Sequence, residues 1–171
     1  MHAFSLSEGR FRTLLALIAA GLLWTALPAL AEDYRALEGV SGLDSVFDIT
    51  LGSPRQAVVT FGAVRDVHRS PAVTSLHAAP RTVLVFHGGA VKLISTDRSD
   101  FLPQEVEALD KVAALIRQFK ADGIRMEVCM YAVNALGVDP ATLMPEVERV
   151  GNGFISVLGY QRQGYALVAV P

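Results

Sequence analysis

The sequence has 171 residues, with 15 lysines and arginines against 17 aspartates and glutamates, and a formal net charge of −2. Because there is no basic surplus, the composition gives no support for binding to nucleic acid. The chain contains a single cysteine, so no intramolecular disulfide can form.

The first 31 residues have the features of a cleavable export signal. Arg10 and Arg12 precede an apolar run, 13–27, and the run 29–31 (Ala-Leu-Ala) matches a small-x-small cleavage site. Since the apolar run is shorter than the roughly 20 residues that span a bilayer, we expect cleavage after Ala31 and not a membrane anchor. Removing 31 of the 171 residues leaves 140, enough for one domain. We expect this mature chain to be periplasmic or secreted, with no membrane association.

The first part of the mature chain shows little regular pattern. Glycines and a proline interrupt residues 32–55, which are predicted to be an irregular N-terminal arm. Within it, Val46–Leu51 alternates weakly and indicates a short edge strand or a docking arm. The domain proper is predicted to span 56–171. Its first strand is expected at Ala57–Phe61, because a short, β-branched, apolar run is typical of a strand buried on both faces.

From Ser70 onward the pattern alternates between helices and strands. Ser70 and Pro71 indicate the start of a helix, as N-cap and first helical residue. Apolar residues at three- and four-residue spacing predict a long helix closed by Gly123. The full expected order is strand Thr82–Phe86, helical turn Val91–Ile94, helix Pro103–Ala121, strand Ile124–Cys129, helix Tyr131–Leu136, a short helix at Asp139 and Pro140, strand Val147–Val150, helix Phe154–Gln163 and strand Tyr165–Val170.

Short apolar strands that alternate with helices are typical of a parallel sheet covered on both faces. The sequence therefore predicts a single three-layer α/β domain, doubly wound, with flavodoxin-like layering and a mostly parallel sheet of four to five strands.

Cys129 is predicted to lie at a position where folds of this class usually bind ligands. It ends a predicted strand, and open α/β sheets bind ligands at the carboxyl ends of their strands. The helix expected to follow would favour the thiolate, the nucleophilic form. Two alternatives stay open at this point: a buried structural thiol, or a redox sensor that forms an intermolecular disulfide across a dimer, since an export signal leads to an oxidising compartment.

His87 follows the strand predicted beside that of Cys129. If the two strands are adjacent and parallel, His87 can act as base or charge partner to the thiolate; the alternative is a hydrogen-bonded loop histidine. Histidine and cysteine positions show no metal-ligand spacing, and no phosphate-loop motif is present, so we expect no metal and no cofactor. Candidate binding residues flank the Cys129–His87 pair: Gly88, Gly89, Met130, Tyr131 and Asn134.

The runs Thr82–Leu93 and Gly123–Pro140, with the tail from Pro145 to Tyr165, resemble the DsrE/DsrF-like family, and the likeness covers roughly residues 56–171. This resemblance implies a three-layer α/β fold, assembly into homo-oligomers, and a sulfur-relay role in which the cysteine matching Cys129 carries a persulfide. It also implies a sulfur donor or acceptor protein as partner. The prediction is therefore an exported DsrE-like protein that binds or relays sulfur through Cys129. The alternative is a non-enzymatic module that binds a small ligand or a protein, with Cys129 buried.

Overall fold

A computed structural model describes residues 34–171, and a five-stranded sheet lies at their centre. The predicted export signal lies outside the described residues. Every neighbouring pair of strands is parallel, and the strand order is β4-β3-β2-β1-β5. The strands are β1 (Ser45–Ile49), β2 (Thr82–Phe86), β3 (Arg125–Cys129), β4 (Glu148–Val150) and β5 (Ala166–Val170).

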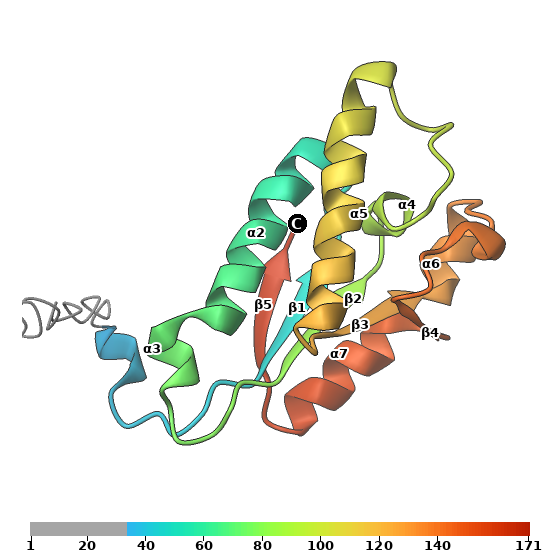
Figure 1. The fold of residues 1–171 in the computed structure, drawn as a ribbon. Helices are drawn as coiled ribbons and strands as arrows, with labels where there is room; N and C mark the ends of the chain where they lie inside the picture. Colours follow the sequence, from blue (N-terminus) through green and yellow to red (C-terminus); the bar gives the residue numbers. More distant parts are fainter. Residues whose placement is uncertain (1–33) are drawn as a thin grey trace, which may run out of the picture. The chain divides into compact units, whose positions relative to one another are not determined.

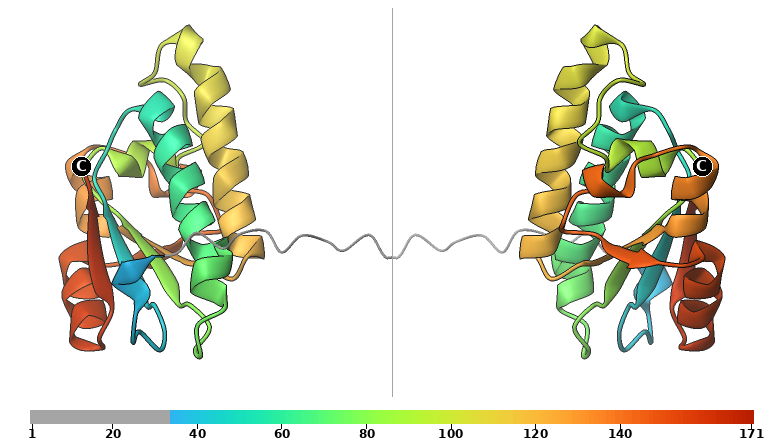
Figure 2. Two further views of the ribbon diagram at one scale, coloured as in Figure 1. Left: turned by 90° about the vertical axis from the view of Figure 1, so that its left-hand side faces the viewer. Right: turned by 90° about the vertical axis from the view of Figure 1, so that its right-hand side faces the viewer.

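Helices cover both faces of this sheet. Two long helices, α2 and α5, lie side by side on one face, and α7 covers the other (Figures 1 and 2). The predicted three-layer α/β fold with a parallel sheet is confirmed. The helical elements are η1 (Arg35–Leu37), α2 (Pro54–Arg69), α3 (Pro71–Thr74), α4 (Ala90–Leu93), η2 (Pro103–Glu105), α5 (Val106–Ala121), α6 (Met130–Ala135), η3 (Pro140–Thr142) and α7 (Gly153–Arg162).

The two faces of the sheet carry cores of different character. On the α2/α5 face, Phe61 meets Phe86 edge-on at 5.8 Å between ring centroids and Phe119 at 6.0 Å. All three rings are fully buried, and aromatic side chains of this size dominate core energetics. The α7 face has a smaller core, made of Val46, Val83, Val85, Val157 and Tyr165.

The prediction of a strand at Ala57–Phe61 is wrong, because these residues lie inside α2. Ser53 caps this helix with its side chain and Pro54 is its first residue, a combination that favours a helix start. Ala57, Phe61 and Val64 are buried at helical spacing. The local preference of the β-branched residues for a strand is therefore overridden by packing against the core.

The predicted strand Val46–Leu51 is present as β1, but its predicted edge position is wrong. β1 lies between β2 and β5, so part of the run assigned to an irregular arm belongs to the interior of the sheet. The remaining predicted elements are present within a few residues of their expected bounds. Helix α5 buries the expected stripe, which includes Leu109, Ile116 and Phe119. Gly123 follows it with φ of +78°, a conformation that glycine adopts without strain.

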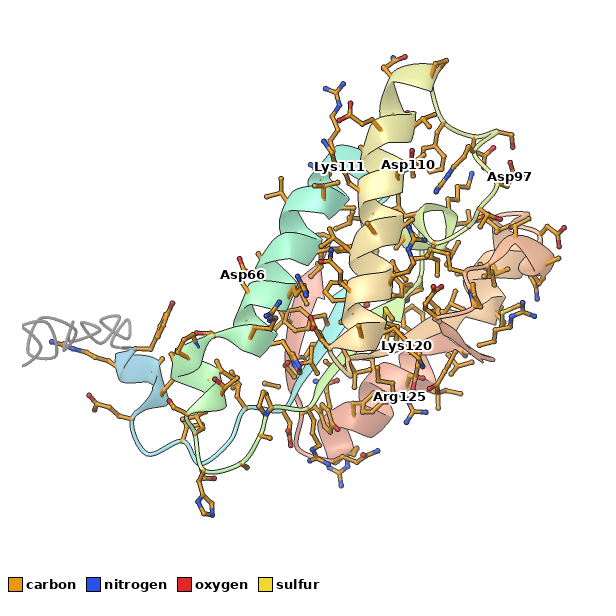
Figure 3. The ribbon with its side chains drawn as sticks, viewed as in Figure 1. Asp66, Asp97, Asp110, Lys111, Lys120 and Arg125 are labelled. Carbon is orange, nitrogen blue, oxygen red and sulfur yellow. The ribbon has the colours of Figure 1, made fainter. Side chains whose placement is uncertain are left out.

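Charged side chains occupy the outer surface of the α2/α5 layer. Figure 3 labels Asp66, Asp110 and Lys111, all exposed. Between the two helices, Arg65 of α2 donates to Asp122 at the end of α5, with Nε and Oδ2 2.6 Å apart. This hydrogen bond lowers the pKa of Asp122. No helix in the described part of the chain is long and apolar enough to cross a membrane.

We expect Asp122→Asn to destabilise the protein by about 1 kcal/mol at neutral pH, because a partly buried charge-assisted hydrogen bond is lost. Since the pKa of Asp122 is lower in the folded state, its contribution is present above the unfolded value of about 4 and is lost as pH falls through the folded value. Urea unfolding at several pH values measures this. The exposed Glu107→Gln, on the same helix, should change stability little; an equal loss in both variants would contradict the assignment.

Candidate functional site

The register of the sheet brings three polar side chains together at its carboxyl edge. Phe86 pairs with Val128, so the next residues along β2 and β3, His87 and Cys129, are level with each other. On β1, Asp48 pairs with Val85, which lies two residues before His87 in the sequence. Because side chains two residues apart share a face and Val85 belongs to the α7-side core, Asp48, His87 and Cys129 all point toward α7.

His87 is held by a carboxylate that the sequence analysis did not identify. Its ring Nε2 contacts Oδ1 of Asp48, while the residue itself is buried, with 4% of its surface exposed. A buried imidazole needs such a partner, and the partner fixes which ring nitrogen is turned toward the rest of the site. Asp48 was missed because it lay in the predicted arm; a single charged residue within the apolar run 46–49 was the signal that could have found it.

Cys129 lies at the end of β3 and is almost fully buried, with 3% exposed. It is covered by the first residue of α7. A β-carbon on Gly153 would lie 3.0 Å from Cβ and 3.6 Å from Sγ of Cys129, and 3.1 Å from Val85 Cγ1. A side chain at position 153 would be closer than ordinary van der Waals contact, so Cys129, Val85 or α7 would have to shift by a few tenths of an ångström. In the described part of the chain the thiol makes no hydrogen bond, and Nε2 of His87 contacts Asp48.

The segment that covers the thiol continues over the histidine. The ring of Phe154 lies edge-on to the ring of His87, with centroids 5.0 Å apart, yet 62% of Phe154 is exposed. Asn152 caps α7 by accepting the Phe154 N–H at 3.0 Å. The preceding turn is tied to α6 by the N–H of Tyr131, which donates to the carbonyl of Gly151 at 3.0 Å. One short segment thus packs against both Cys129 and His87.

Gly88 and Gly89 bring the loops that follow β1 and β2 into contact. Gly88 has φ of +52°, and a β-carbon on Gly89 would lie 3.0 Å from Cα of Gly52. Any larger residue at position 89 would push the two loops apart. Backbone packing between the two loops is therefore sufficient to explain why positions 88 and 89 are both glycine.

The other predicted binding residues lie on α6. Met130 is partly buried and packs against the main core. Tyr131 exposes 71% of its surface and reaches the site through its backbone N–H only. Asn134 is exposed near the end of the helix. Of the three, Tyr131 is tied to the segment that covers Cys129.

A buried carboxylate lies beneath the site on the same face. Glu127, two residues before Cys129, has 4% of its surface exposed. The hydroxyl of Tyr160 donates to its Oε1 at 2.6 Å, and Arg125 Nε is 3.1 Å from the same oxygen. Oε2 has no hydrogen-bond partner among residues 34–171. Burial, followed by the hydrogen bond to Glu127, raises the pKa of Tyr160. The sequence analysis did not identify this pair either.

Within residues 34–171, no cluster of three or more His, Cys, Asp or Glu side chains is arranged to hold a metal ion. The chemical groups of the site are therefore one thiol, one imidazole with its carboxylate, and the backbone groups of the loops around them.

Comparison with known proteins gives one family and one fold. The model of the DsrE/DsrF-like family matches residues 56–170. No protein among the curated ones matches the chain. Among solved structures, the protein of unknown function MTH1491 from Methanobacterium thermoautotrophicum is similar at a TM-score of 0.57 and 18% identity, over 74% of this chain and 98% of that one. At this identity the likeness shows the fold alone.

We expect Tyr160→Phe to destabilise the protein by about 1–3 kcal/mol, because the buried Glu127 loses its hydroxyl donor. The raised pKa of Tyr160 means that its contribution is fully present below the unfolded value of about 10 and is lost as pH rises through the folded value. The difference in unfolding free energy between wild type and variant should therefore shrink above that pH.

Tyr131→Phe is the matched control, since this hydroxyl belongs to an exposed side chain and its loss should change stability by less than about 0.5 kcal/mol. Equal stability of wild type and Tyr160→Phe at neutral pH would show that the hydroxyl does not stabilise the buried carboxylate.

Proposed function

Because the chain belongs to the DsrE/DsrF-like family, we propose that it carries sulfur outside the cytoplasm as a persulfide on Cys129. The observation that supports this most is the alignment of Asp48, His87 and Cys129 on three neighbouring strands, facing the same side of the sheet. An imidazole oriented by a carboxylate, on the strand next to that of a thiol, can serve as the base that activates a cysteine nucleophile when the two come into contact.

The proposed step is transfer of one sulfane sulfur. The Cys129 thiolate attacks the terminal sulfur of thiosulfate or of a donor persulfide, and a new S–S bond forms at Sγ. The S–S bond of the donor breaks, and its electron pair leaves on sulfite or on the donor thiolate. His87 accepts the thiol proton at the start, with Asp48 stabilising the imidazolium. No external oxidant or reductant is needed.

Access to Sγ requires movement of the segment over it. Gly153 and Phe154 cover Cys129 and His87. A β-carbon added to Gly151 would have no neighbour within 4 Å. The local hydrogen bonds that hold this turn are few and include Tyr131 N–H to the Gly151 carbonyl and Phe154 N–H to the Asn152 side chain, each at 3.0 Å, so opening breaks few contacts. We therefore infer that the first turn of α7 lifts to admit a donor.

A protein donor or acceptor is the partner we propose for this step. Exposed apolar side chains gather near the covering segment, from α6 and the outer side of α7, and a sulfur partner could dock on them. They are Tyr131, Phe154, Ile155 and Leu158, exposed by 71%, 62%, 71% and 63%.

A second candidate function is a non-enzymatic binding module in which Cys129 only packs. The burial of the thiol favours it, because free cysteine is among the residue types most often buried and the 3.0 Å approach of Gly153 leaves little room around Cβ. Such a module takes up no sulfur at Cys129 under conditions in which it stays folded.

We expect mass spectrometry of the native protein after incubation with thiosulfate, or with a small alkyl persulfide, to show the added mass of one sulfur atom on the peptide that contains Cys129. Cys129→Ser should acquire none. His87→Asn should slow the loading by roughly tenfold or more, as loss of an acid–base group does. His77→Asn, the same change at an exposed histidine, should load at the wild-type rate.

The absence of an adduct on folded wild-type protein would favour the second candidate. Equal loading of wild type and Cys129→Ser would remove Cys129 from the chemistry, and equal rates in the two histidine variants would remove His87.

For export, we propose cleavage after Ala31, as the small-x-small pattern indicates. Expressed with its full sequence in a bacterial host, the protein should be recovered from the periplasm or medium, and intact mass should correspond to a chain that begins at Glu32. Recovery of the uncleaved chain from the cytoplasm would contradict this proposal.

A further inference from the structure

Glu127 is a buried carboxylate that the proposed sulfur transfer leaves unused. It lies two residues before Cys129 on β3, roughly 6.6 Å away along the strand, and its register partner Val85 belongs to the α7-side core. Glu127 and Cys129 therefore both face α7. Only 4% of Glu127 is exposed, yet its Oε2 accepts no hydrogen bond within residues 34–171. Because a buried polar atom without a partner costs free energy, Oε2 marks a place for a donor group that no described residue supplies.

The other oxygen of this carboxylate is fixed in place. Oε1 accepts the hydroxyl of Tyr160 at 2.6 Å and lies 3.1 Å from Nε of Arg125, a residue labelled in Figure 3. The same guanidinium also binds Glu148, with Nη2 and Oε2 2.6 Å apart. One basic side chain thus serves two acidic ones. Since buried charges are normally paired, a cation is the ligand that completes the group.

The first turn of α7 lies over both the thiol and this level of the sheet. A β-carbon on Gly153 would lie 3.0 Å from Cβ of Cys129 and 3.1 Å from Cγ1 of Val85, the register partner of Glu127. Tyr160 follows Gly153 by seven residues, about 10 Å along the helix axis. Movement of the first turn alone therefore opens the space beside thiol and carboxylate, while Tyr160 keeps the carboxylate oriented.

We propose that Oε2 of Glu127 binds the ammonium group of an aminothiol persulfide, so that the sulfur donor of this site is a small cationic persulfide and not the thiosulfate anion. This inference rests on the proposed function, because it names the donor for the same transfer; the protein partner is then the acceptor. The Cys129 thiolate attacks the terminal sulfur of the bound donor, and the new S–S bond forms at Sγ. The donor S–S bond breaks, and its electron pair leaves on the aminothiol sulfur, which takes up the proton that His87 accepted.

An ammonium group suits Oε2 better than a neutral or anionic group does. A charge-assisted hydrogen bond is roughly twice as strong as a neutral one, and the ammonium offsets the excess acidic side chain. Thiosulfate would instead bring further negative charge to a layer in which charges are weakly screened. Because Glu127 and Cys129 are two residues apart on one face, a donor with two carbons between nitrogen and sulfur can reach both.

The first experiment compares the loading of Cys129 from aminoethyl persulfide and from hydroxyethyl persulfide, followed by mass spectrometry on the protein as its host processes it. The readout is the ratio of the two loading rates at low donor concentration, since a merely structural defect would slow both donors alike. Glu127→Gln keeps an oxygen for Tyr160 but replaces Oε2 by an amide nitrogen. We expect it to lower the aminoethyl-to-hydroxyethyl ratio by about tenfold or more. Any difference in intrinsic reactivity between the donors cancels, because both proteins meet the same pair.

Glu148→Gln is the matched control. It makes the same change on the neighbouring strand, at a carboxylate that shares Arg125 but has half of its side chain exposed to solvent. Its ratio should equal that of wild type. An equal fall of the ratio in both variants would show a general effect of surface charge and would overturn the assignment to Glu127.

The second experiment needs no variant. (Methylthio)ethylamine carries the ammonium group but no transferable sulfur, so it should raise the concentration of aminoethyl persulfide that half-saturates loading and leave the maximal rate unchanged. (Methylthio)ethanol, which has a hydroxyl in place of the ammonium, should not compete at the same concentration.

The outcomes separate this inference from the proposed function. Loading of wild type with the same ratio as Glu127→Gln, equal competition by the two sulfides, or loading from thiosulfate alone would overturn the cationic donor and leave sulfur transfer at Cys129 standing. Loading from none of the donors would overturn both.

Discussion

Helix α7 rests directly on the end of β3, where a β-carbon on Gly153 would lie 3.0 Å from Cβ of Cys129, and the organisation of the site depends on this contact. It buries the only thiol of the chain, and it brings Phe154 over His87. It also fixes the depth at which Tyr160, two turns further along α7, reaches the carboxylate of Glu127. One glycine therefore sets both the protection of the thiol and the seating of the helix on the sheet.

The two faces of the sheet differ in the side chains that they bury. The α2/α5 face buries three phenylalanines in contact, and a tightly packed core of this kind resists change. The α7 face has a thin valine core and accommodates Asp48, Glu127 and His87. Polar groups at this depth are tolerated because most of them find partners, and the unpartnered Oε2 of Glu127 is the exception.

The sequence predicted the layers of the fold, because short apolar strands and capped helices leave clear local signals. It placed Cys129 and His87 on neighbouring strands, which the register then brought level. It failed where tertiary packing overrides local preference: Ala57–Phe61 is helical because Ser53 and Pro54 start a helix and its buried residues recur at helical spacing. That error moved the domain boundary past β1, and Asp48 was lost with it. The cover of Gly153 over the thiol depends on contacts between segments far apart in sequence, which spacing alone does not reveal.

The central claim is that Cys129 becomes accessible by local movement of α7 and not by unfolding. The most direct test measures the labelling rate of Cys129 by a thiol reagent across a series of denaturant concentrations, together with the free energy of global unfolding. We predict labelling through an opening that costs much less than unfolding and varies little with denaturant, as local fluctuations do. A labelling rate that follows global unfolding at every denaturant concentration would contradict the account and show that Cys129 only packs.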